Sequence, residues 1–573
     1  MKLYYCILSA LILWVSFCSC NSTKAGREED VEIFEYRDIY LPDYNKNSNA
    51  ALELDDVEQA WGIWGHHLGN VLPHDPSPET FARVKDDILE DQFCFSSSDL
   101  YDYIVDYIHG EYLFTDSVRF AILPNDNDIV CLCHECVANG NKAGDASPAV
   151  FKLLEKLSKK FPQHMFFTSY YSTTRSLPEK NMPSNTGVIV SAMDYPLTTH
   201  ETRQETHFMD LLKKWSEKTD KVYVWDYVNN FDDYFTPYPV FSVMQRRLKN
   251  YRDAGVDGVF LNGSGPDYSV LGRLKKAVLS QLMINPDLDW EELLKKYAKD
   301  YYPLAGDDIA EFIIAQEKMV QVNKKILPMY DGVELAIDIY LPEQDFMEFY
   351  NKMVQHKRKA TGAEKEDLEL MTDAMALTVL ELKRINHDLD GTEKLKERLR
   401  RLPARNIPYY NEGCWSIDQY LSSYEFMEKD AHETAETNLL KDKEITPLTE
   451  LDEEYENISI LTDGQLGIPS NYHNGNLISS ADPYLRLSIP RVPGMKKIRV
   501  WMVNSPGFKI GLPSEVALSS GGLPLKSQIP EKPQHGTGHS YLDFDVPPTG
   551  DIILTLYKNP DIKTMAIDEI QAF

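Results

Sequence analysis

The 573-residue chain carries 89 Asp and Glu residues against 59 Lys and Arg residues, which gives a formal charge of −30 and a pI near 4.9. Phosphate binding needs clustered Lys and Arg, so this charge excludes nucleic acid as an expected partner and discourages polyanionic substrates, whereas neutral glycans remain compatible. A chain of this length exceeds one hydrophobic core, so two or three domains are expected.

The N-terminal segment has the composition of an export signal. Lys2 precedes a mostly apolar run from Leu3 to Phe17, which is too short to span a bilayer comfortably. The next residues, Phe17-Cys18-Ser19-Cys20, resemble a bacterial lipoprotein processing box with Cys20 as the lipidated residue, and an ordinary cleaved secretory signal is the alternative. We therefore expect a signal peptide at 1–20 and a polar tether at 21–30. The mature protein is then exported and lipid-anchored at the bacterial cell envelope, on the periplasmic or surface face of the outer membrane, with the anchor as its only membrane contact.

Short apolar strands alternate with amphipathic helices between residues 31 and 270, a pattern typical of a parallel α/β fold. The predicted strands are Val31–Tyr36, Trp61–Trp64, Val118–Leu123, Met165–Tyr170, Val188–Ala192, Val222–Trp225 and Val259–Leu261. Seven clear strands favour a (β/α)8-like barrel of the TIM type over an open doubly wound sheet. No Gly-x-Gly-x-x-Gly motif follows any strand, so no dinucleotide site is indicated and we expect no cofactor.

Two further regions follow the predicted barrel. Residues 271–440 read as a helical domain, and residues 441–456 as an acidic linker. From 457 to 573 the apolar period changes to 2, which predicts an all-β sandwich. Its candidate glycan contacts are Tyr472, His473, Asn474 and Trp501, although Trp501 lies inside an alternating strand and such residues are more often core.

Carboxylates follow three of the predicted strands, at the edge where β/α barrels carry their active sites. Asp126 and Asp128 follow one strand, and Asp194 and Asp226 each follow another. Cleavage of a glycosidic bond usually needs two carboxyl groups that flank the bond. We therefore assign Asp126 as general acid. Asp226, in preference to Asp194, is assigned as the base or stabilising carboxylate. An ordinary Asn-Asp-Asn-Asp turn is the alternative for the first pair.

The stretch Trp225-Asp226-Tyr227 ends a buried strand in an aromatic–carboxylate–aromatic cluster. Aromatic faces pack on sugar rings, and polar neighbours bind the hydroxyls. The predicted substrate-binding residues are Trp64, His66, His67, Asn125, Asp128, Asp194, Tyr195, Trp225 and Tyr227. Rings that only pack, and a buried hydrogen-bonded histidine, are the alternatives. His66 and His67 face opposite sides of a strand, which makes them a poor metal pair.

Three cysteines cluster as C-x-C-H-E-C at Cys131, Cys133 and Cys136. Together with His134 they could bind zinc, but structural zinc sites usually show paired cysteine spacing and a fourth ligand. Disulfides are the commoner outcome in an exported protein. We therefore expect Cys131 or Cys133 to pair with Cys136 and brace the loop that carries Asp126, and we expect no metal.

Several segments together resemble the domain of unknown function 4838 family over residues 31–390. They are Trp64-Gly65-His66-His67 with Leu72-Pro73, Phe93-Cys94-Phe95-Ser96, Leu123-Pro124-Asn125-Asp126-Asn127-Asp128, Cys131-x-Cys133-x-x-Cys136 and Leu282-x-Ile284-Asn285-Pro286-Asp287. The resemblance implies an exported bacterial protein, often a lipoprotein, with a barrel similar to those of α-glucuronidases and β-hexosaminidases. Asn125 stands where hexosaminidase-like barrels have the first of two carboxylates. Members commonly carry an extra N-terminal α/β domain, for which this chain has no room.

The C-terminal region is similar to discoidin-like carbohydrate-binding sandwiches, through Leu461-Thr462-Asp463-Gly464 and Val516–Gly521. Together these features predict a glycoside hydrolase-like lipoprotein, an O-glycosyl hydrolase that acts on a complex glycan by carboxylate acid–base chemistry. The alternative is a non-catalytic glycan-binding lipoprotein that kept the groove and lost the chemistry, which the amide at position 125 favours.

Overall fold

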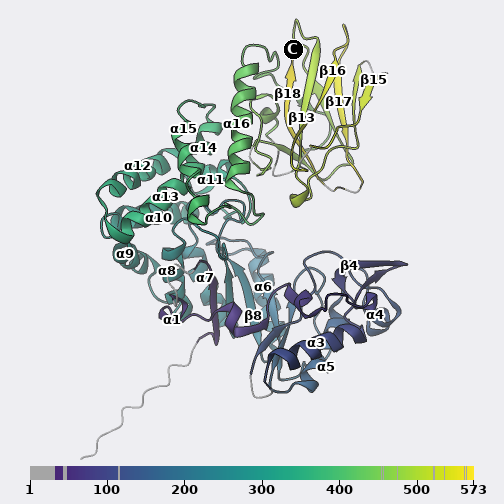
Figure 1. Cartoon of the computed structure of the whole chain (residues 1–573), viewed down its shortest axis with the longest axis vertical. Helices are drawn as coiled ribbons and strands as arrows, with labels where there is room; N and C mark the ends of the chain where they lie inside the picture. Colours follow the sequence, from purple (N-terminus) through teal and green to yellow (C-terminus); the bar gives the residue numbers. More distant parts are fainter. Residues whose placement is uncertain are drawn as a thin grey trace, which may run out of the picture.

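The structure is a computed structural model that describes residues 33–573 except 43–47, 114–116, 453–454, 456, 471, 474, 521–522, 534–535, 561 and 563. The predicted signal peptide, Cys20, the tether and Asn474 lie outside the described residues. Figure 1 shows a parallel-sheet part, a helical part and a C-terminal part built of strands, in chain order. Across the described residues, no helix is both long and apolar enough to cross a bilayer.

Seven parallel strands form one sheet in the order β1-β9-β8-β7-β6-β5-β2. They are β1 (Tyr36–Tyr40), β2 (Trp61–Ile63), β5 (Arg119–Ala121), β6 (Met165–Tyr170), β7 (Thr186–Ser191), β8 (Val222–Tyr227) and β9 (Gly258–Asn262). Every strand contributes a side chain to one apolar cluster, which contains Tyr36, Trp61, Ala121, Phe167, Ile189, Tyr223 and Phe260. Side chains from both edge strands and the centre meet in one cluster because the sheet is curled around them.

The seam between β1 and β2 distinguishes this sheet from the predicted eight-stranded barrel. No backbone pairing joins these two strands in the described chain, yet the rings of Tyr36 and Trp61 lie 5.7 Å apart, edge to face. On its other side β1 pairs directly with β9, where an eighth strand would otherwise stand. The predicted fold class is therefore confirmed as a curled parallel sheet, but a closed eight-stranded barrel is not what the described residues form.

Helices and one hairpin accompany this sheet. The helices are α1 (Ser48–Ala51), α2 (Val57–Ala60), α3 (Ser98–Glu111), α4 (His134–Asn139), α5 (Ser147–Lys160), α6 (Arg203–Ser216), α7 (Phe241–Asp253) and α8 (Gly272–Ile284). Between β2 and α3 the sequence analysis predicted no strands, but the chain forms the antiparallel hairpin of β3 (Phe81–Val84) and β4 (Asp87–Phe93). The hairpin lies at the same end of the molecule as α3, α4 and α5 (Figure 1).

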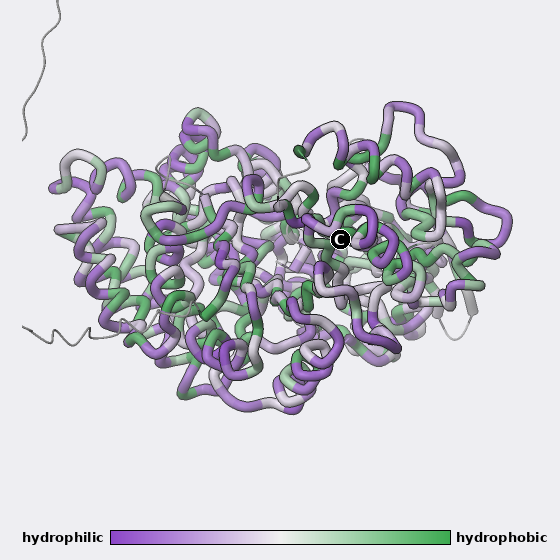
Figure 2. The backbone as a smooth tube through the Cα atoms, turned by 90° about the horizontal axis from the view of Figure 1, so that it is seen from below, coloured by the Kyte–Doolittle hydropathy of each residue, from purple (hydrophilic) through white to green (hydrophobic). Residues whose placement is uncertain are grey.

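The helical part runs from α9 to α16. Its members are α9 (Trp290–Tyr301), α10 (Gly306–Asn323), α11 (Val333–Ile339), α12 (Glu343–Lys359), α13 (Gly362–Ala374), α14 (Ala376–Ile385), α15 (Glu393–Leu399) and α16 (Ile417–Thr434). Hydrophilic and hydrophobic turns alternate along the outer helices (Figure 2), as expected for helices that bury one face. The last helix, α16, opens with a capping box between Ser416 and Gln419 and lies beside the C-terminal strands (Figure 1).

The C-terminal part is a sandwich of two antiparallel sheets, β10-β12-β17-β14-β15 and β11-β18-β13-β16. The strands are β10 (Thr446–Pro447), β11 (Leu477–Ser479), β12 (Tyr484–Ile489), β13 (Lys497–Asn504), β14 (Glu515–Ser520), β15 (Leu523–Gln528), β16 (Gly538–Asp545), β17 (Ile552–Tyr557) and β18 (Met565–Ala572). Strand β10 belongs to the stretch predicted as a linker, but it pairs with β12. Trp501 on β13 is buried, donates to Gln571 and contacts Phe426 of α16, so it packs the sandwich against the helical part.

Candidate functional site

A cavity of about 300 Å³ lies at the carboxyl ends of strands β5 to β9. It is lined by His66, Leu123, Asp126, Ser169, Tyr171, Ile189, Ser191, Met193, Trp225, Tyr227, Asn262, Tyr330 and Glu412. Strand ends therefore supply most of the wall, while Tyr330 and Glu412 come from the helical part. This is the edge at which parallel β/α folds bind their ligands.

Asp126 reaches this cavity on a loop that the hairpin strand β4 holds in place. The Gln92 side chain donates to the Asn125 carbonyl and to Asn127 Oδ1, both at 3.0 Å. The amides of Asn125 and Asn127 donate in turn to the Asp91 carbonyl, both at 2.9 Å. The Asn125 side chain, predicted to bind substrate, is thus used to fasten the loop. Asp128 is exposed and is not part of the cavity wall.

Glu412 is the second carboxylate of the cavity, and the sequence analysis missed it. Its backbone N–H donates to the Phe231 carbonyl at 2.8 Å, which ties the Glu412 loop to the segment after β8. Tyr330 is held to the same segment, because the Phe231 N–H donates to the Met329 carbonyl at 2.7 Å. The Tyr330 hydroxyl then donates to Glu412 Oε2 at 3.3 Å.

The surroundings of Glu412 favour its protonated form. Glu412 is an exposed residue that faces the cavity, and the partial desolvation of its carboxyl by the cavity wall raises the pKa of that carboxyl. The negative charges of Asp232 and Asp126 raise that pKa further, whereas the hydrogen bond from Tyr330 lowers it. Asp126 and Glu412 are the two carboxyl groups that line this cavity.

Aromatic rings form much of the remaining wall. Trp225 stacks on Trp64 with ring centroids 5.1 Å apart and planes 9° apart, so Trp64 supports Trp225 from outside the wall. Gly65, next to Trp64, has φ +54°, a left-handed conformation that favours glycine at this turn. The Tyr227 hydroxyl lies 3.2 Å from Ser191 Oγ. Of the predicted aromatic wall, Trp225 and Tyr227 therefore line the cavity.

The two predicted histidines separate. His66 lines the cavity, and its Nδ1 lies 2.6 Å from the Pro124 carbonyl oxygen. A carbonyl can only accept, so Nδ1 carries the proton and Nε2 of the neutral ring is left as an acceptor. His67 is exposed, begins a 3₁₀ helix and is not part of the wall.

Asp226 and Tyr195 are placed elsewhere, which corrects their predicted roles. Side chains alternate along β8, so Asp226 points to the opposite face from Trp225 and Tyr227. Its fully buried carboxylate is bound by Arg247 of α7 and accepts from the Tyr251 hydroxyl at 2.5 Å. Tyr195 is also buried, with the Arg247 guanidinium 3.9 Å above its ring. Both residues hold α7 against the sheet, and neither lines the cavity.

Asp194 lines a second recess of about 420 Å³ and forms an exposed ion pair with Arg175 at 2.7 Å. This recess shares Tyr171 and Ser191 with the first cavity, so the two are neighbours. The predicted residue Asp194 therefore lies next to the cavity rather than in it.

The predicted disulfide is not formed. Cys131, Cys133 and Cys136 are free thiols, as is Cys94. All four sulfurs lie within 4.8 Å of one another. His134 points into solvent, with its side chain 91 % exposed.

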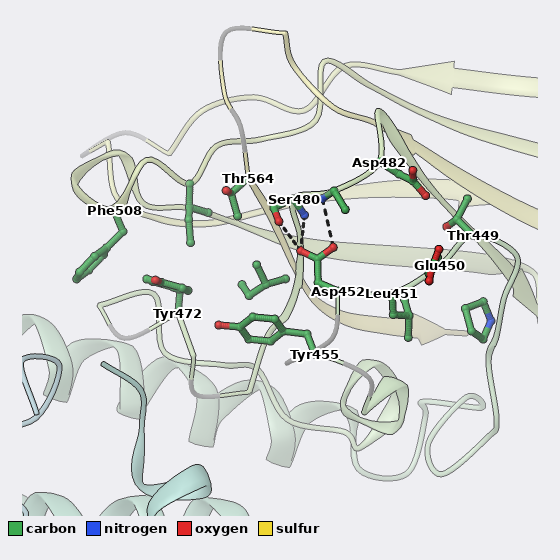
Figure 3. Close-up of a pocket in the computed structure, with 14 residues that line it drawn as sticks. Thr449, Glu450, Leu451, Asp452, Tyr455, Tyr472, Ser480, Asp482, Phe508 and Thr564 are labelled. Atoms are coloured by element: carbon green, nitrogen blue, oxygen red, sulfur yellow. Dashed lines mark hydrogen bonds between the residues drawn. The ribbon is translucent and has the colours of Figure 1, made fainter. Parts of the chain in front are cut away.

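A larger, more open groove of about 1110 Å³ lies in the sandwich. Figure 3 shows Tyr455, Tyr472 and Phe508 at one end of this groove, and Thr449, Glu450 and Asp482 at the other. The Asp452 carboxylate between them is already satisfied, because it accepts from Ser480 N at 2.7 Å, from Ser480 Oγ at 2.6 Å and from Ala481 N at 3.2 Å. Of the glycan contacts predicted in the sandwich, Tyr472 lines this groove.

Fold and cavity together define a curled parallel α/β protein with an acidic, aromatic-lined pocket at its strand ends. The chain belongs to the family described as domain of unknown function (DUF4838), whose model matches residues 20–313, just over half of the sequence. None of the curated proteins compared with this sequence matches it.

The solved structures to which this chain is similar include the following three, all at low similarity. One is a GH138 enzyme targeting pectin rhamnogalacturonan II, at 9 % identity and a TM-score of 0.33, covering 95 % of this chain and 86 % of that one. Another is a family GH115 4-O-methyl-α-glucuronidase with specificity for decorated arabinogalactans. It has 12 % identity and a TM-score of 0.30, and the match covers 95 % of this chain and 81 % of that one. The third is a Streptococcus pneumoniae fucose-binding module, at 12 % identity and 0.19, covering 24 % of this chain and 97 % of that one.

Proposed function

We propose that this chain is a glycoside hydrolase that acts on a complex glycan from an exported, lipid-anchored position at the bacterial cell envelope. The observation that carries the proposal is that two carboxyl groups from distant parts of the chain, Asp126 and Glu412, line one aromatic-walled cavity. Glycosidic hydrolysis by paired carboxyl groups needs this arrangement. The predicted signal and Cys20 support the location.

The cavity wall favours a neutral, hydroxyl-rich ligand. Among the described residues that line it there is no Lys or Arg, so a phosphate or sulfate group would meet carboxylates without a compensating cation. Trp225, Tyr171 and Tyr227 offer rings for stacking on a sugar, and His66 Nε2 and Asn262 offer polar contacts to hydroxyls. The neighbouring recess at Asp194 would hold the next unit of the glycan, and the sandwich groove offers a second glycan surface.

The environments of the two carboxyl groups set their roles. A raised pKa favours the protonated form of the Glu412 carboxyl, so we assign to Glu412 the donation of a proton to the glycosidic oxygen as the bond breaks. Asp126 on the same wall is then the second carboxylate, which activates water or attacks the sugar carbon. The general-acid role that the sequence pattern favoured for Asp126 is thus assigned to Glu412.

The pH dependence of turnover should report Glu412. An acid must be protonated to act, so turnover is present below the Glu412 pKa and is lost as pH rises through it. Because that pKa is raised, the loss should occur at a higher pH than for an ordinary glutamate.

Tyr330→Phe should move this alkaline limb further up, because it removes the hydrogen bond that lowers the Glu412 pKa. A pH profile of kcat for the parent and Tyr330→Phe measures the shift, with exposed Tyr484→Phe as control. An unchanged or lowered limb in Tyr330→Phe would show that Glu412 is not the titrating acid.

The experiment that tests the function is a panel of glycans and aryl glycosides incubated with residues 21–573, with binding and product release followed in parallel. Binding and hydrolysis of one substrate class is the expected result. Binding without hydrolysis would instead make the chain a glycan-capture protein. The absence of any binding across neutral glycans would overturn the proposed ligand class.

A further inference from the structure

The structure places four cysteines in the geometry of a metal site that the sequence pattern alone left incomplete. Cys94 follows β4, Cys131 and Cys133 precede α4, and Cys136 lies in its first turn. Their sulfurs all lie within 4.8 Å of one another, and Cys94 Sγ is 3.7 Å from both Cys133 Sγ and Cys136 Sγ. Cys94 is the fourth ligand that the C-x-C-x-x-C cluster lacked.

These separations suit one ion bound by four thiolates. A tetrahedral zinc site with Zn–S bonds of about 2.3 Å has sulfurs about 3.8 Å apart. The two sulfur–sulfur distances from Cys94 are close to that edge length. In addition, backbone pairing fixes the segments that carry the sulfurs, since the N–H of Cys94 donates to the Thr80 carbonyl and that of Leu132 to the Arg83 carbonyl, both at 2.8 Å.

Backbone N–H groups are directed at two of the four sulfurs. The Arg83 backbone N–H donates to Cys131 Sγ at 3.3 Å, and the Cys136 N–H donates to Cys133 Sγ at 3.4 Å. N–H donors stabilise negative charge on sulfur and orient metal ligands. Cys94, Cys131 and Cys136 are buried in an apolar cluster, so water competes poorly for the ion. His134 faces solvent and is not a ligand.

We propose that Cys94, Cys131, Cys133 and Cys136 bind one structural zinc ion through all four of their sulfurs. On binding, the four thiols release their protons to solvent and the ion takes four Zn–S bonds, with no change in oxidation state. No position is left for water, so the site is structural rather than catalytic.

The site would brace the loop that carries Asp126. Cys94 lies two residues after Gln92, which holds Asn125 and Asn127, and Cys131 lies four residues after Asn127. A zinc ion would therefore join the end of β4 to the end of the Asp126 loop. This inference does not depend on the proposed hydrolase activity, since metal content is measured without substrate.

The test is the zinc content of residues 21–573, purified without affinity metals and washed with a weak chelator. One zinc ion per chain is expected, together with one fast-reacting thiol, exposed Cys414, and four more thiols that react only after a strong chelator is added. Cys133→Ser should lose the zinc, whereas Cys414→Ser should keep it. Removal of the ion should lower the melting temperature of the parent and not that of Cys133→Ser.

A cobalt substitution keeps the proposal testable even if the cysteine variants fail to fold. The parent chain loaded with Co²⁺ should show the intense sulfur-to-metal charge-transfer bands and the visible bands of tetrahedral thiolate cobalt. Zinc-free protein with two disulfides, seen as an intact mass about four hydrogens lighter, would overturn the proposal. Zinc-free protein with five freely reactive thiols would overturn it equally.

Discussion

Glu412→Gln should lower turnover by roughly 10²- to 10⁴-fold, the usual contribution of a general acid, while leaving glycan binding nearly unchanged. Glutamine keeps the size of the side chain and can still accept from Tyr330, but it cannot donate a proton to the leaving group. The measurement is kcat and the dissociation constant on the glycan that the panel identifies. Aryl glycosides with good leaving groups need less acid assistance, so the loss on them should be smaller.

Glu436→Gln is the matched control, since Glu436 is exposed and remote from the cavity wall. It should leave both constants unchanged. Equal turnover by Glu412→Gln and the control would contradict the role of Glu412. A Glu412→Gln variant that no longer binds the glycan would make Glu412 a binding residue instead of the acid.

Asp226→Asn should destabilise the protein by about 3–5 kcal/mol, because it leaves the Arg247 guanidinium buried without its charge partner. The expected result is a lower melting temperature and a lower free energy of unfolding in urea. Asp194→Asn is the matched control, because its ion pair with Arg175 is exposed and such pairs contribute only about 0–1 kcal/mol.

A second variant pair separates the ion pair from general disruption of the core. Asp226→Leu alone leaves the buried Arg247 charge without a partner, and adding Arg247→Met removes that charge. The double variant should therefore be more stable than Asp226→Leu. If Asp226→Asn unfolds like the parent, the buried ion pair does not stabilise the fold as described. Full stability with complete loss of turnover would return Asp226 to the catalytic role predicted from sequence.

Much of the parallel sheet follows from local pattern, because buried parallel strands are short apolar runs between amphipathic helices. Met165–Tyr170 is predicted at its observed bounds, whereas the first strand begins at Tyr36 rather than Val31. The position of Asp226 could also have been predicted from the sequence. Side chains alternate along a strand, so Trp225 and Tyr227 lie on one face of β8 and Asp226 lies on the other. The hairpin at 81–93 was missed because β4 is polar and mostly exposed, with no buried face to mark it.

The sequence predicted those residues of the candidate site that lie at the end of a single strand. Asp126, His66, Trp225 and Tyr227 lie in the cavity as their positions at strand ends predict. Glu412 could not be found this way, because tertiary contacts between the helical part and the segment after β8 bring it there. One local signal does mark the Glu412 loop. Tyr410, Gly413 and Trp415 form an aromatic, glycine-containing stretch in an otherwise helical region.

The most direct test of the central claim is turnover of the best-bound glycan by the parent, Asp126→Asn and Asp226→Asn, at a temperature where circular dichroism shows all three folded. The cavity predicts that Asp126→Asn binds the glycan but hydrolyses it at least about 10²-fold more slowly, while folded Asp226→Asn keeps most of its turnover. Full activity in Asp126→Asn, or no hydrolysis by the parent despite binding, would contradict the claim that this cavity is a hydrolytic site.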